Sequence, residues 1–583
     1  MASRSSGPRS LDTVAEPRSR KLLVEQPHRF SGGLKLLLLV FALVPVSACS
    51  QQSTYRDSCK ASTAGTSEDC LDYSPLSSSG RSEQIRSYPG VPEPTGLVPS
   101  AIMPTVPTGA DRQAFPYDPR SVAATLPEPW PSEAAAGAYY IDRHDPSATD
   151  FNNAFGYPDK PRATIPASAR GPGTSYVEIH GSNKPYKQQS PEYLLGKNTI
   201  SNAGRAEAPT VWQCIDGAWI GAKITIVGQH VVVDGCNFQN EDGNPSIPHV
   251  SVGPGAKFVT LRNSTFRGQG TPIKGGTGQI INIAGQPDRE VEFVMIFNNV
   301  ISGGGDWTRD HKKDIHAVRP LYWARYIWVL ENDLSHVQGD LVQTGNSSNR
   351  SKDPAQRSHY IYIAGNHMHD AFENALDNKN SYHVILSSNN IHGFGNARTG
   401  TAVILSNNDE GRYTGYHWAI RNEIYDATGG AIRFSGDQDG QKTFAVGNYI
   451  HDVDDGIRFG GHSGYAENDE WAVGNLIKDC SNRAIAFPRG AGENLTIRRN
   501  VTIDCPLHVA GEQNFRHSEI SYNLFLNSNG SRARVGLRDF DTQVENSTDG
   551  TVADIRIILN ADDGVYSVFE SLYGFSISPI EGE

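Results

Sequence analysis

The sequence has little of what builds helical proteins and no excess of basic charge. Glycine and proline number 58 and 34 among 583 residues, a balance that argues against a helical bundle or a coiled coil. Lysine and arginine number 52 against 64 aspartates and glutamates, which gives a net charge of −12. Nucleic acid is not expected as a partner, because phosphate binding needs dense basic charge. The composition favours a turn-rich β protein, in which clustered arginine or a metal ion can still hold an anionic polymer.

The chain also lacks an apolar run long enough to span a bilayer comfortably. The run at residues 34–46 is short and follows a segment with several basic and few acidic residues, which predicts a signal peptide over residues 1–48. It ends in Val46-Ser47-Ala48-Cys49, which resembles the bacterial lipobox, where small residues precede a cysteine that becomes lipidated. The resemblance implies a lipid anchor on Cys49 and, because Ser50 follows, an outer-membrane lipoprotein of the bacterial cell envelope. A short anchor or a buried strand is the alternative interpretation.

Residues 49–135 lack any sustained hydrophobic period. They are rich in serine, threonine, proline, glycine and glutamine. This composition predicts a disordered, semi-extended linker that holds the folded part away from the membrane surface. The folded domain is expected over residues 136–583.

From about residue 200 onward the chain repeats a short pattern, and this is its most informative property. An asparagine followed by a short apolar strand recurs at intervals of 23 to 35 residues. The recurring asparagines are Asn237, Asn263, Asn298, Asn332, Asn366, Asn389, Asn422, Asn448, Asn475, Asn500 and Asn523. A unit of this length, with strands of period two, cannot bury its apolar face alone and must stack on its neighbours.

Such stacking predicts an all-β, right-handed parallel β-helix of about ten coils, and a monomer is expected. Each repeat forms one coil, and equivalent residues of successive coils lie about 4.8 Å apart. Asparagine at a fixed corner tolerates left-handed backbone geometry and can hydrogen-bond to the next coil. Leucine-rich repeats would need a leucine pattern that is absent, and a propeller would need longer and more regular repeats.

Cysteine spacing agrees with the predicted coils. Apart from Cys49, six cysteines remain, an even number that suits an oxidising compartment. They form three candidate disulfides, namely Cys59 with Cys70, Cys214 with Cys236, and Cys480 with Cys505. The last two pairs are 22 and 25 residues apart, about one coil each. Cys480 and Cys505 should therefore lie above one another, where a bridge and simple apolar stacking are both open.

Charged residues concentrate on the second strand of each repeat. The inward column is taken as Ile315, Leu341, Leu376, Val403, Ile432, Ile457 and Ile485, so that alternate residues face outward. Asp314 and Asp340 then occupy the same place in consecutive coils, where two carboxylates about 5 Å apart repel unless a cation or a proton lies between them. A Ca²⁺ ion is the economical interpretation, with Glu373 or Asp377 completing the shell. Turn residues that cap backbone amides are the alternative.

This acidic ladder and the segment Glu373-Asn374-Ala375-Leu376-Asp377-Asn378-Lys379 resemble the β-helix polysaccharide lyases, particularly those of the family 9 type. The family 6 type is similar in its chemistry. The resemblance implies stacked aspartates that bind Ca²⁺ and a lysine, here Lys379, that acts as the Brønsted base. It also implies an acidic, uronate-containing polysaccharide as the substrate.

β-Elimination from a uronate needs a base for the proton α to the carboxylate, a cation for that carboxylate and a donor for the leaving oxygen. Lys379 can be the base if nearby positive charge and partial burial lower its pKa. Arg433 and Arg458 are predicted to bind substrate carboxylates, Arg433 within the catalytic set. His316 is the candidate second acid or base, and Trp307 is a candidate for stacking on a sugar.

Other functions remain open. A uronan C5-epimerase abstracts the same proton and differs only in reprotonation, although the Asp-Pro-His-Asp segment of the alginate epimerases is absent. A non-catalytic carbohydrate-binding or structural surface β-helix would leave Lys379 solvated and Arg433 and Arg458 in surface salt bridges. The polygalacturonase Gly-His-Gly segment, GxSxG, HExxH and a P-loop are all missing from the sequence.

Overall fold

The computed structural model describes the greater part of the chain from residue 115 onward. The described residues are 115–123, 130, 136–181, 199–221, 223–239, 248–268, 278–308, 314–345, 356–395, 400–407, 416–436, 442–460, 469–487, 495–511, 515–521, 523–527, 534–536 and 540–544. The predicted signal peptide, Cys49, Cys59 and Cys70 lie outside them. Within the described residues, no helix has the length and apolar character needed to cross a membrane.

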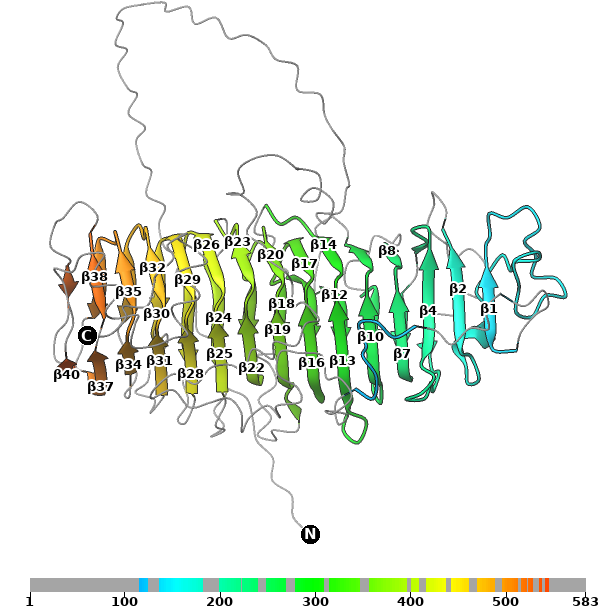
Figure 1. The fold of residues 1–583 in the computed structure, drawn as a ribbon, viewed down its shortest axis with the longest axis horizontal. Coiled ribbons are helices and arrows are strands. Elements are labelled where there is room, and N and C mark those ends of the chain that lie inside the picture. Colours follow the sequence, from blue (N-terminus) through cyan, green and yellow to red (C-terminus); the bar gives the residue numbers. More distant parts are fainter. Residues whose placement is uncertain are drawn as a thin grey trace, which may run out of the picture. The chain divides into compact units, whose positions relative to one another are not determined.

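Three parallel sheets run side by side through the described residues (Figure 1). Sheet 1 has 15 strands: β1 (Ala138–Ile141), β2 (Tyr176–His180), β4 (Thr210–Ile215), β7 (Gln229–Asp234), β10 (Lys257–Arg262), β13 (Val291–Phe297), β16 (Ala324–Leu330), β19 (His359–Ala364), β22 (Tyr382–Ser387), β25 (Tyr416–Ile420), β28 (Lys442–Val446), β31 (Asp469–Val473), β34 (Leu495–Arg498), β37 (Phe515–Ser521) and β40 (Phe540–Val544). Sheet 2 has 12 strands: β5 (Trp219–Ile220), β8 (Asn237–Gln239), β11 (Thr265–Arg267), β14 (Val300–Gly304), β17 (Asp333–Val337), β20 (His367–His369), β23 (Asn390–His392), β26 (Glu423–Ala427), β29 (Tyr449–Val453), β32 (Leu476–Lys478), β35 (Val501–Ile503) and β38 (Leu524–Leu526).

Sheet 3 has 13 strands: β3 (Thr199–Ile200), β6 (Ile224–Ile226), β9 (Val250–Val252), β12 (Gly278–Ile283), β15 (Ile315–Pro320), β18 (Val342–Thr344), β21 (Leu376–Asn378), β24 (Thr401–Asn407), β27 (Gly430–Gly436), β30 (Asp455–Arg458), β33 (Arg483–Phe487), β36 (Leu507–Gly511) and β39 (Val535–Gly536). A short 3-10 helix, η3 (Ala167–Arg170), lies between β1 and β2 in sequence. Successive strands of one sheet come from successive coils, so the predicted parallel β-helix is confirmed. It has more coils than the ten expected, because the first coils lack the asparagine signal.

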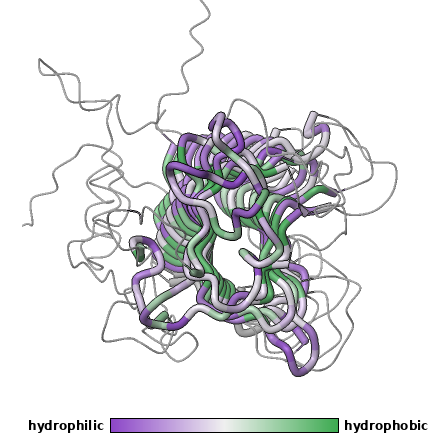
Figure 2. Tube along the Cα trace, turned by 90° about the vertical axis from the view of Figure 1, so that its right-hand side faces the viewer, coloured by the Kyte–Doolittle hydropathy of each residue, from purple (hydrophilic) through white to green (hydrophobic). Residues whose placement is uncertain are grey.

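The interior is filled by columns of apolar side chains from equivalent positions of successive coils. Figure 2 shows the coils one behind another, with hydrophobic positions falling in line. One column on sheet 3 contains Val318, Val342, Leu376, Val403, Ile432, Ile457 and Ile485, all buried. The predicted inward column is therefore confirmed from Leu376 onward. In the two preceding coils the prediction is wrong, because Val318 and Val342 occupy the column in place of Ile315 and Leu341. Both coils have apolar residues close together, and period two alone cannot choose between them.

A ladder of buried asparagine side chains joins the coils at the corner between sheets 1 and 2. The side-chain amide of each member donates to the side-chain oxygen of the next, at 2.9 to 3.0 Å. The members are Asn299, Asn332, Asn366, Asn389, Asn422, Asn448, Asn475, Asn500 and Asn523. Each repeat is thus held to its neighbours by a buried, satisfied polar group as well as by the sheets.

The ladder corrects the predicted asparagine positions in the first coils. The first asparagine of the ladder is Asn299 rather than Asn298. In the coil before it, Ser264 holds the equivalent position and donates its backbone N–H to the Asn299 side-chain oxygen at 2.9 Å. Asn263 and Asn298 lie immediately before ladder positions and have φ of 51° and 52°. The left-handed residue is therefore the one before the ladder position, not the ladder asparagine itself.

Residues 115–123, predicted to belong to the linker, instead contact the outer face of sheet 1. Phe115 is buried against the rings of Phe258, Phe293 and Trp328. The guanidinium of Arg262 donates to the carbonyl oxygens of Pro119 and Val122 at 3.0 and 2.7 Å. Residues 115–123 thus pack on the predicted folded domain, because aromatic residues of sheet 1 offer an apolar surface to this segment.

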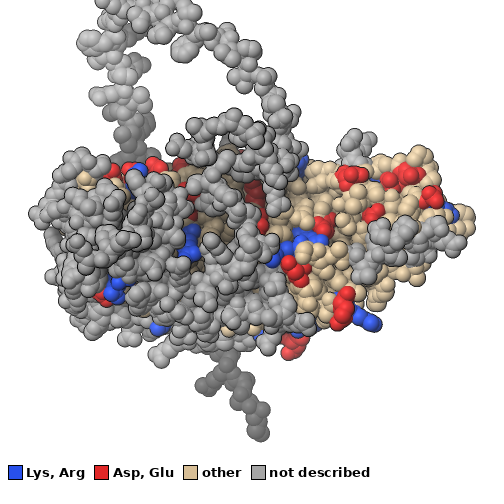
Figure 3. All heavy atoms as spheres, in the orientation of Figure 1, with Lys and Arg blue, Asp and Glu red and all other residues tan. Residues whose placement is uncertain are grey.

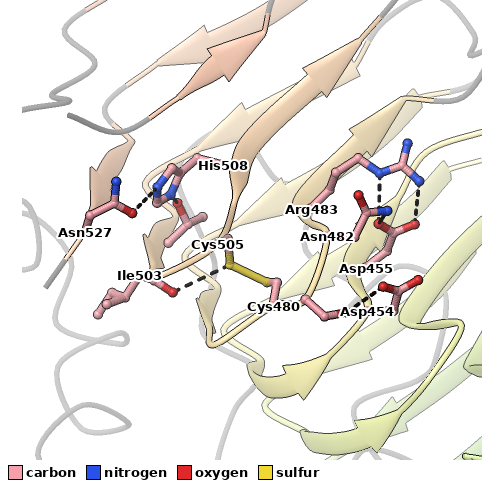
Figure 4. The surroundings of a disulfide bond; sticks show 11 residues. Asp454, Asp455, Cys480, Asn482, Arg483, Ile503, Cys505, His508 and Asn527 are labelled. Atoms are coloured by element: carbon pink, nitrogen blue, oxygen red, sulfur yellow. Dashed lines mark hydrogen bonds and ion pairs between the residues drawn. A yellow bond between two sulfur atoms is a disulfide. The ribbon is translucent and has the colours of Figure 1, made fainter. Parts of the chain in front are cut away.

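Two disulfides connect consecutive coils. Cys214 bridges Cys236, and Cys480 bridges Cys505. Figure 4 shows the second bridge at the turns that follow β32 and β35, close to the pair formed by Asp455 and Arg483. The predicted coil register around both cysteine pairs is confirmed.

Candidate functional site

The charged residues singled out in the sequence gather on and beside the outward face of sheet 3. Acidic and basic side chains are interspersed on the described surface in view (Figure 3). One outward column contains Arg319, Gln343, Asp377, Ile404, Arg433 and Arg458. A carboxylate therefore lies in line with guanidinium groups on both sides, which is an arrangement that an extended charged ligand can follow.

Asp340 lies opposite His316 and not opposite Asp314. Because Val318 pairs with Val342, the residues two positions before them, His316 and Asp340, are neighbours in consecutive coils. The backbone N–H of Asp340 donates to Nδ1 of His316 at 3.0 Å, and the Asp340 Oδ2 atom lies 3.2 Å from the same nitrogen. The predicted stacked pair of Asp314 and Asp340 is therefore wrong, because it followed from the incorrect inward column.

His316 and Asp340 are also buried, although both were predicted to face outward. Neither side chain is exposed to solvent. Burial, followed by the charge of Arg319, lowers the pKa of His316 to about 3, so the ring is neutral and Nδ1 can accept the Asp340 N–H. Its Nε2 atom and the Asp340 Oδ1 atom have no hydrogen-bond partner within the described part of the chain. His316 can act on a substrate only if the site opens, so its predicted role as second acid or base loses its basis.

Asp377 and Lys379 form an ion pair at the centre of the site. The Lys379 Nζ atom lies 3.0 Å from Asp377 Oδ2, and both side chains are largely buried. Burial alone would lower the pKa of Lys379, but the carboxylates of Asp377 and Asp340 raise it above its usual value. The condition under which Lys379 could act as the base, a lowered pKa, is therefore not met, because its close neighbours carry negative charge.

The carboxyl groups around Lys379 hold their protons more strongly than usual. Burial raises the pKa of Asp377 to about 6, and Asp340 adds to the effect. Burial, Asp340 and Asp314 together raise the pKa of Glu373 to about 9. At neutral pH the site thus combines an ionised Asp377 with a protonated Glu373, and carboxyl groups held in different states can act as base and acid.

The four carboxylates predicted to hold Ca²⁺ do not converge in this arrangement. Among the described residues, no three of Asp314, Asp340, Glu373 and Asp377 bring oxygen atoms within 4.8 Å of one another. A Ca²⁺ shell needs six to eight oxygens at about 2.3 to 2.6 Å from one ion. The side chains as placed therefore do not form a calcium site.

The remaining predicted residues have different surroundings. Arg433 and Arg458 are neighbours in consecutive strands. The Nε atom of Arg458 also lies 3.6 Å from Asp455 Oδ2, which agrees with the surface salt bridge considered as its alternative role. Trp307 packs edge-on against His336 of β17, with ring centroids 4.9 Å apart. Its ring thus contacts a residue of sheet 2.

Two residues of the site were missed in the sequence. Gln343 donates to Asp340 Oδ2 at 2.9 Å, and Arg319 occupies the same outward column one coil earlier. Both would have been found if Val318 and Val342 had been assigned to the inward column, since each charged or amide residue follows its valine directly.

The fold and the site together define a parallel β-helix protein with an outward charged face on one sheet. No protein-family model matches the chain, and no curated protein matches it. Similar solved structures include the periplasmic alginate epimerase AlgG, with 11% identity over 65% of this chain and 76% of that chain and a TM-score of 0.33. A GH136 lacto-N-biosidase from Eubacterium ramulus matches with 12% identity over 70% of this chain and 68% of that chain, with a TM-score of 0.39.

A mannuronic acid specific polysaccharide family 6 lyase from human gut microbiota matches with 12% identity over 67% of this chain and 92% of that chain, with a TM-score of 0.37. Similarity at this level of identity concerns the fold. It assigns neither an activity nor functional residues to this chain.

The acidic site predicts that stability falls as pH rises. The folded protein keeps a proton on Glu373 up to about pH 9, whereas the unfolded chain releases it near 4.5. Because the native state binds more protons across this window, the free energy of unfolding decreases with rising pH. We expect Glu373→Gln to have a flatter profile of melting temperature between about pH 5 and about pH 9. Identical slopes for the variant and the original protein would contradict the raised pKa.

Proposed function

We propose that this protein cleaves a uronate-containing polysaccharide by β-elimination on the outward face of sheet 3. The observation that carries the proposal is the contact of the Lys379 ammonium group with Asp377, at 3.0 Å. It places a fixed cation beside a carboxylate whose pKa is about 6. A cation neutralises the substrate carboxylate and so makes the α-proton more acidic, while a carboxylate of this pKa is ionised and basic enough to remove it.

The residues then divide the reaction between them. The Asp377 carboxylate accepts the proton from C5, and the electron pair of that C–H bond forms the double bond between C4 and C5. The bond from C4 to the glycosidic oxygen breaks, and the leaving oxygen takes a proton from Glu373, which burial keeps protonated at neutral pH. Lys379 stays protonated throughout and holds the uronate carboxylate. Lys379 is thus the electrostatic partner in this proposal, and Asp377 replaces it as the base.

Substrate binding extends along the outward column. Arg433 and Arg458 lie two and three strands beyond Asp377, and Arg319 lies two strands before it. Guanidinium groups hold carboxylates through paired hydrogen bonds, so these positions suit further uronates of the same polymer. Calcium stays a prediction, and it is tested by measuring β-elimination with added Ca²⁺ and again after chelation, where an unchanged rate would contradict it.

The test is an assay on alginate, pectate and glycosaminoglycans that records two products in parallel. β-Elimination creates an unsaturated uronate that absorbs in the ultraviolet, together with a new reducing end. We expect both signals to rise together on at least one uronan and neither to rise on a neutral glycan. Reducing ends without ultraviolet absorbance would show hydrolysis, and neither signal on any uronan would contradict a lyase.

Glycoside hydrolysis is a second candidate, favoured by the protonated Glu373 beside an ionised Asp377. Most glycosidases use such a pair of carboxyl groups as their catalytic residues. An epimerase remains a third possibility, because it would abstract the same proton without cleavage. Incorporation of deuterium from heavy water into an uncleaved polymer would identify that reaction.

We further propose that the protein is a monomeric lipoprotein of a bacterial outer membrane, anchored through Cys49. The support for the anchor is the sequence at residues 46–49, and Ser50 after it favours the outer membrane. An anchored enzyme of this kind would act on polymers at the cell envelope.

A further inference from the structure

Three histidines lie together on the outer face of sheet 2, which the proposed function does not use. His367 and His369 belong to β20, and His392 belongs to the neighbouring strand β23 (Figure 1). The alternate residues Met368 and Ile391 are fully buried in the core. Because side chains alternate along a strand, the three imidazoles all point to the outside of the same sheet.

Their ring nitrogens converge on one point. The Nε2 atoms of His367 and His392 are 2.9 Å apart, and one ring nitrogen from each of the three histidines lies within 4.8 Å of the others. Among the described residues, this is the one group of histidine, cysteine and acidic side chains with such spacing. Two nitrogens bound to one tetrahedral Zn²⁺ lie about 3.3 Å apart, given Zn–N bonds of about 2.0 to 2.1 Å. His367 and His392 are therefore already close to the separation that a shared ion would impose, and His369 lies within 4.8 Å of both.

Carboxylates complete and orient the group. The Asp333 Oδ1 atom, from the preceding coil, lies 3.2 Å from His369 Nε2, so this carboxylate stands beside the group, although only the three histidines share the 4.8 Å spacing. The other nitrogen of His369, Nδ1, lies 2.8 Å from Asp370 Oδ2. A carboxylate on the far nitrogen of a ligating histidine fixes its tautomer and leaves Nε2 unprotonated for the metal.

We propose that His367, His369 and His392, with Asp333, form a site for a divalent transition-metal ion of the Zn²⁺ class. Imidazole nitrogen suits Zn²⁺, Ni²⁺, Cu²⁺ and Co²⁺, whereas Ca²⁺ and Mg²⁺ prefer oxygen ligands. The ligands come from β17, β20 and β23, so the ion ties three consecutive coils together. The site is separate from the charged face of sheet 3, and its existence does not depend on the proposed lyase activity.

The experiment uses the protein without a histidine tag, stripped of metal by a chelator and then dialysed. Titration calorimetry with Zn²⁺ is expected to show one tight equivalent, and Co²⁺ is expected to give the visible absorption of a tetrahedral complex. His392→Ala should weaken Zn²⁺ binding by at least about 100-fold, because it removes a direct ligand. Zn²⁺ should raise the melting temperature of the original protein and leave that of His392→Ala unchanged.

His451→Ala is the matched control. His451 also faces outward from sheet 2, two strands beyond His392, where it contacts Asp452 at 2.7 Å and lies outside the histidine group. Its substitution should leave Zn²⁺ affinity unchanged. If His392→Ala unfolds, His367→Gln replaces it, since His367 is the most exposed of the three. Equal Zn²⁺ affinity in a ligand variant and the control, or no binding by the original protein, would overturn the proposal.

Discussion

Lys379→Arg is expected to keep much of the activity, whereas Lys379→Ala is expected to lower kcat/KM by about 10²- to 10³-fold. The ammonium group is held between carboxylates that raise its pKa, so its contribution is a fixed positive charge. A guanidinium group supplies such a charge but cannot remove a proton at working pH. The two variants are measured on the best substrate found in the ultraviolet assay. Comparing them shows whether Lys379 acts as a fixed cation or as a base.

Lys257→Ala is the control for removing an ion-paired lysine. Lys257 contacts Glu292 on sheet 1, away from the candidate site, and its loss should leave kcat/KM unchanged. If Lys379→Arg is as inactive as Lys379→Ala, the lysine is the base, as the resemblance to the polysaccharide lyases implied. If both variants remain fully active, Lys379 has no part in the reaction.

Asp377→Asn should reduce kcat by about 10²- to 10⁴-fold, the usual cost of removing a general base. The amide keeps the shape of the side chain and its outward position on β21 but cannot accept the proton. In the unsubstituted protein, kcat/KM should fall as pH decreases through about 6, because Asp377 is then protonated. The residual activity of Asp377→Asn should lack this acidic limb.

Asp454→Asn is the corresponding control, since Asp454 accepts a hydrogen bond from Ser481 in a turn and lies outside the outward column. It should keep both the rate and the pH profile of the original protein. A residual rate above about a tenth in Asp377→Asn would place the base elsewhere.

The fold was predictable because it repeats. Period-two strands at recurring intervals indicated stacked coils, and the inward column chosen from them placed Ile432, Ile457 and Ile485 together, as the structure has them. The choice of inward column failed where adjacent residues were both apolar, as at Leu341 and Val342. A shift of one residue exchanges the inward and outward faces, so this single error moved Asp340 from a buried corner to the surface.

The chemistry of the site was less predictable than its location. The segment from Glu373 to Lys379 was found from its residue types, but its protonation depends on which carboxylates become buried beside the lysine. The histidine group was missed, although a signal existed. His369 and His392 each lie three residues after a ladder asparagine, Asn366 and Asn389, so the repeat itself places them in neighbouring coils.

The asparagine ladder has a direction, because every side-chain amide donates to the next coil and accepts from the one before. Any intermediate coil therefore carries one complete donor and one complete acceptor at its corner. A duplicated coil that runs from one ladder asparagine to the next carries the same donor and acceptor. It can therefore be inserted between two coils with all the ladder hydrogen bonds formed. This architecture can thus lengthen by gene duplication in whole units, while an insertion within the corner would interrupt the chain of amides.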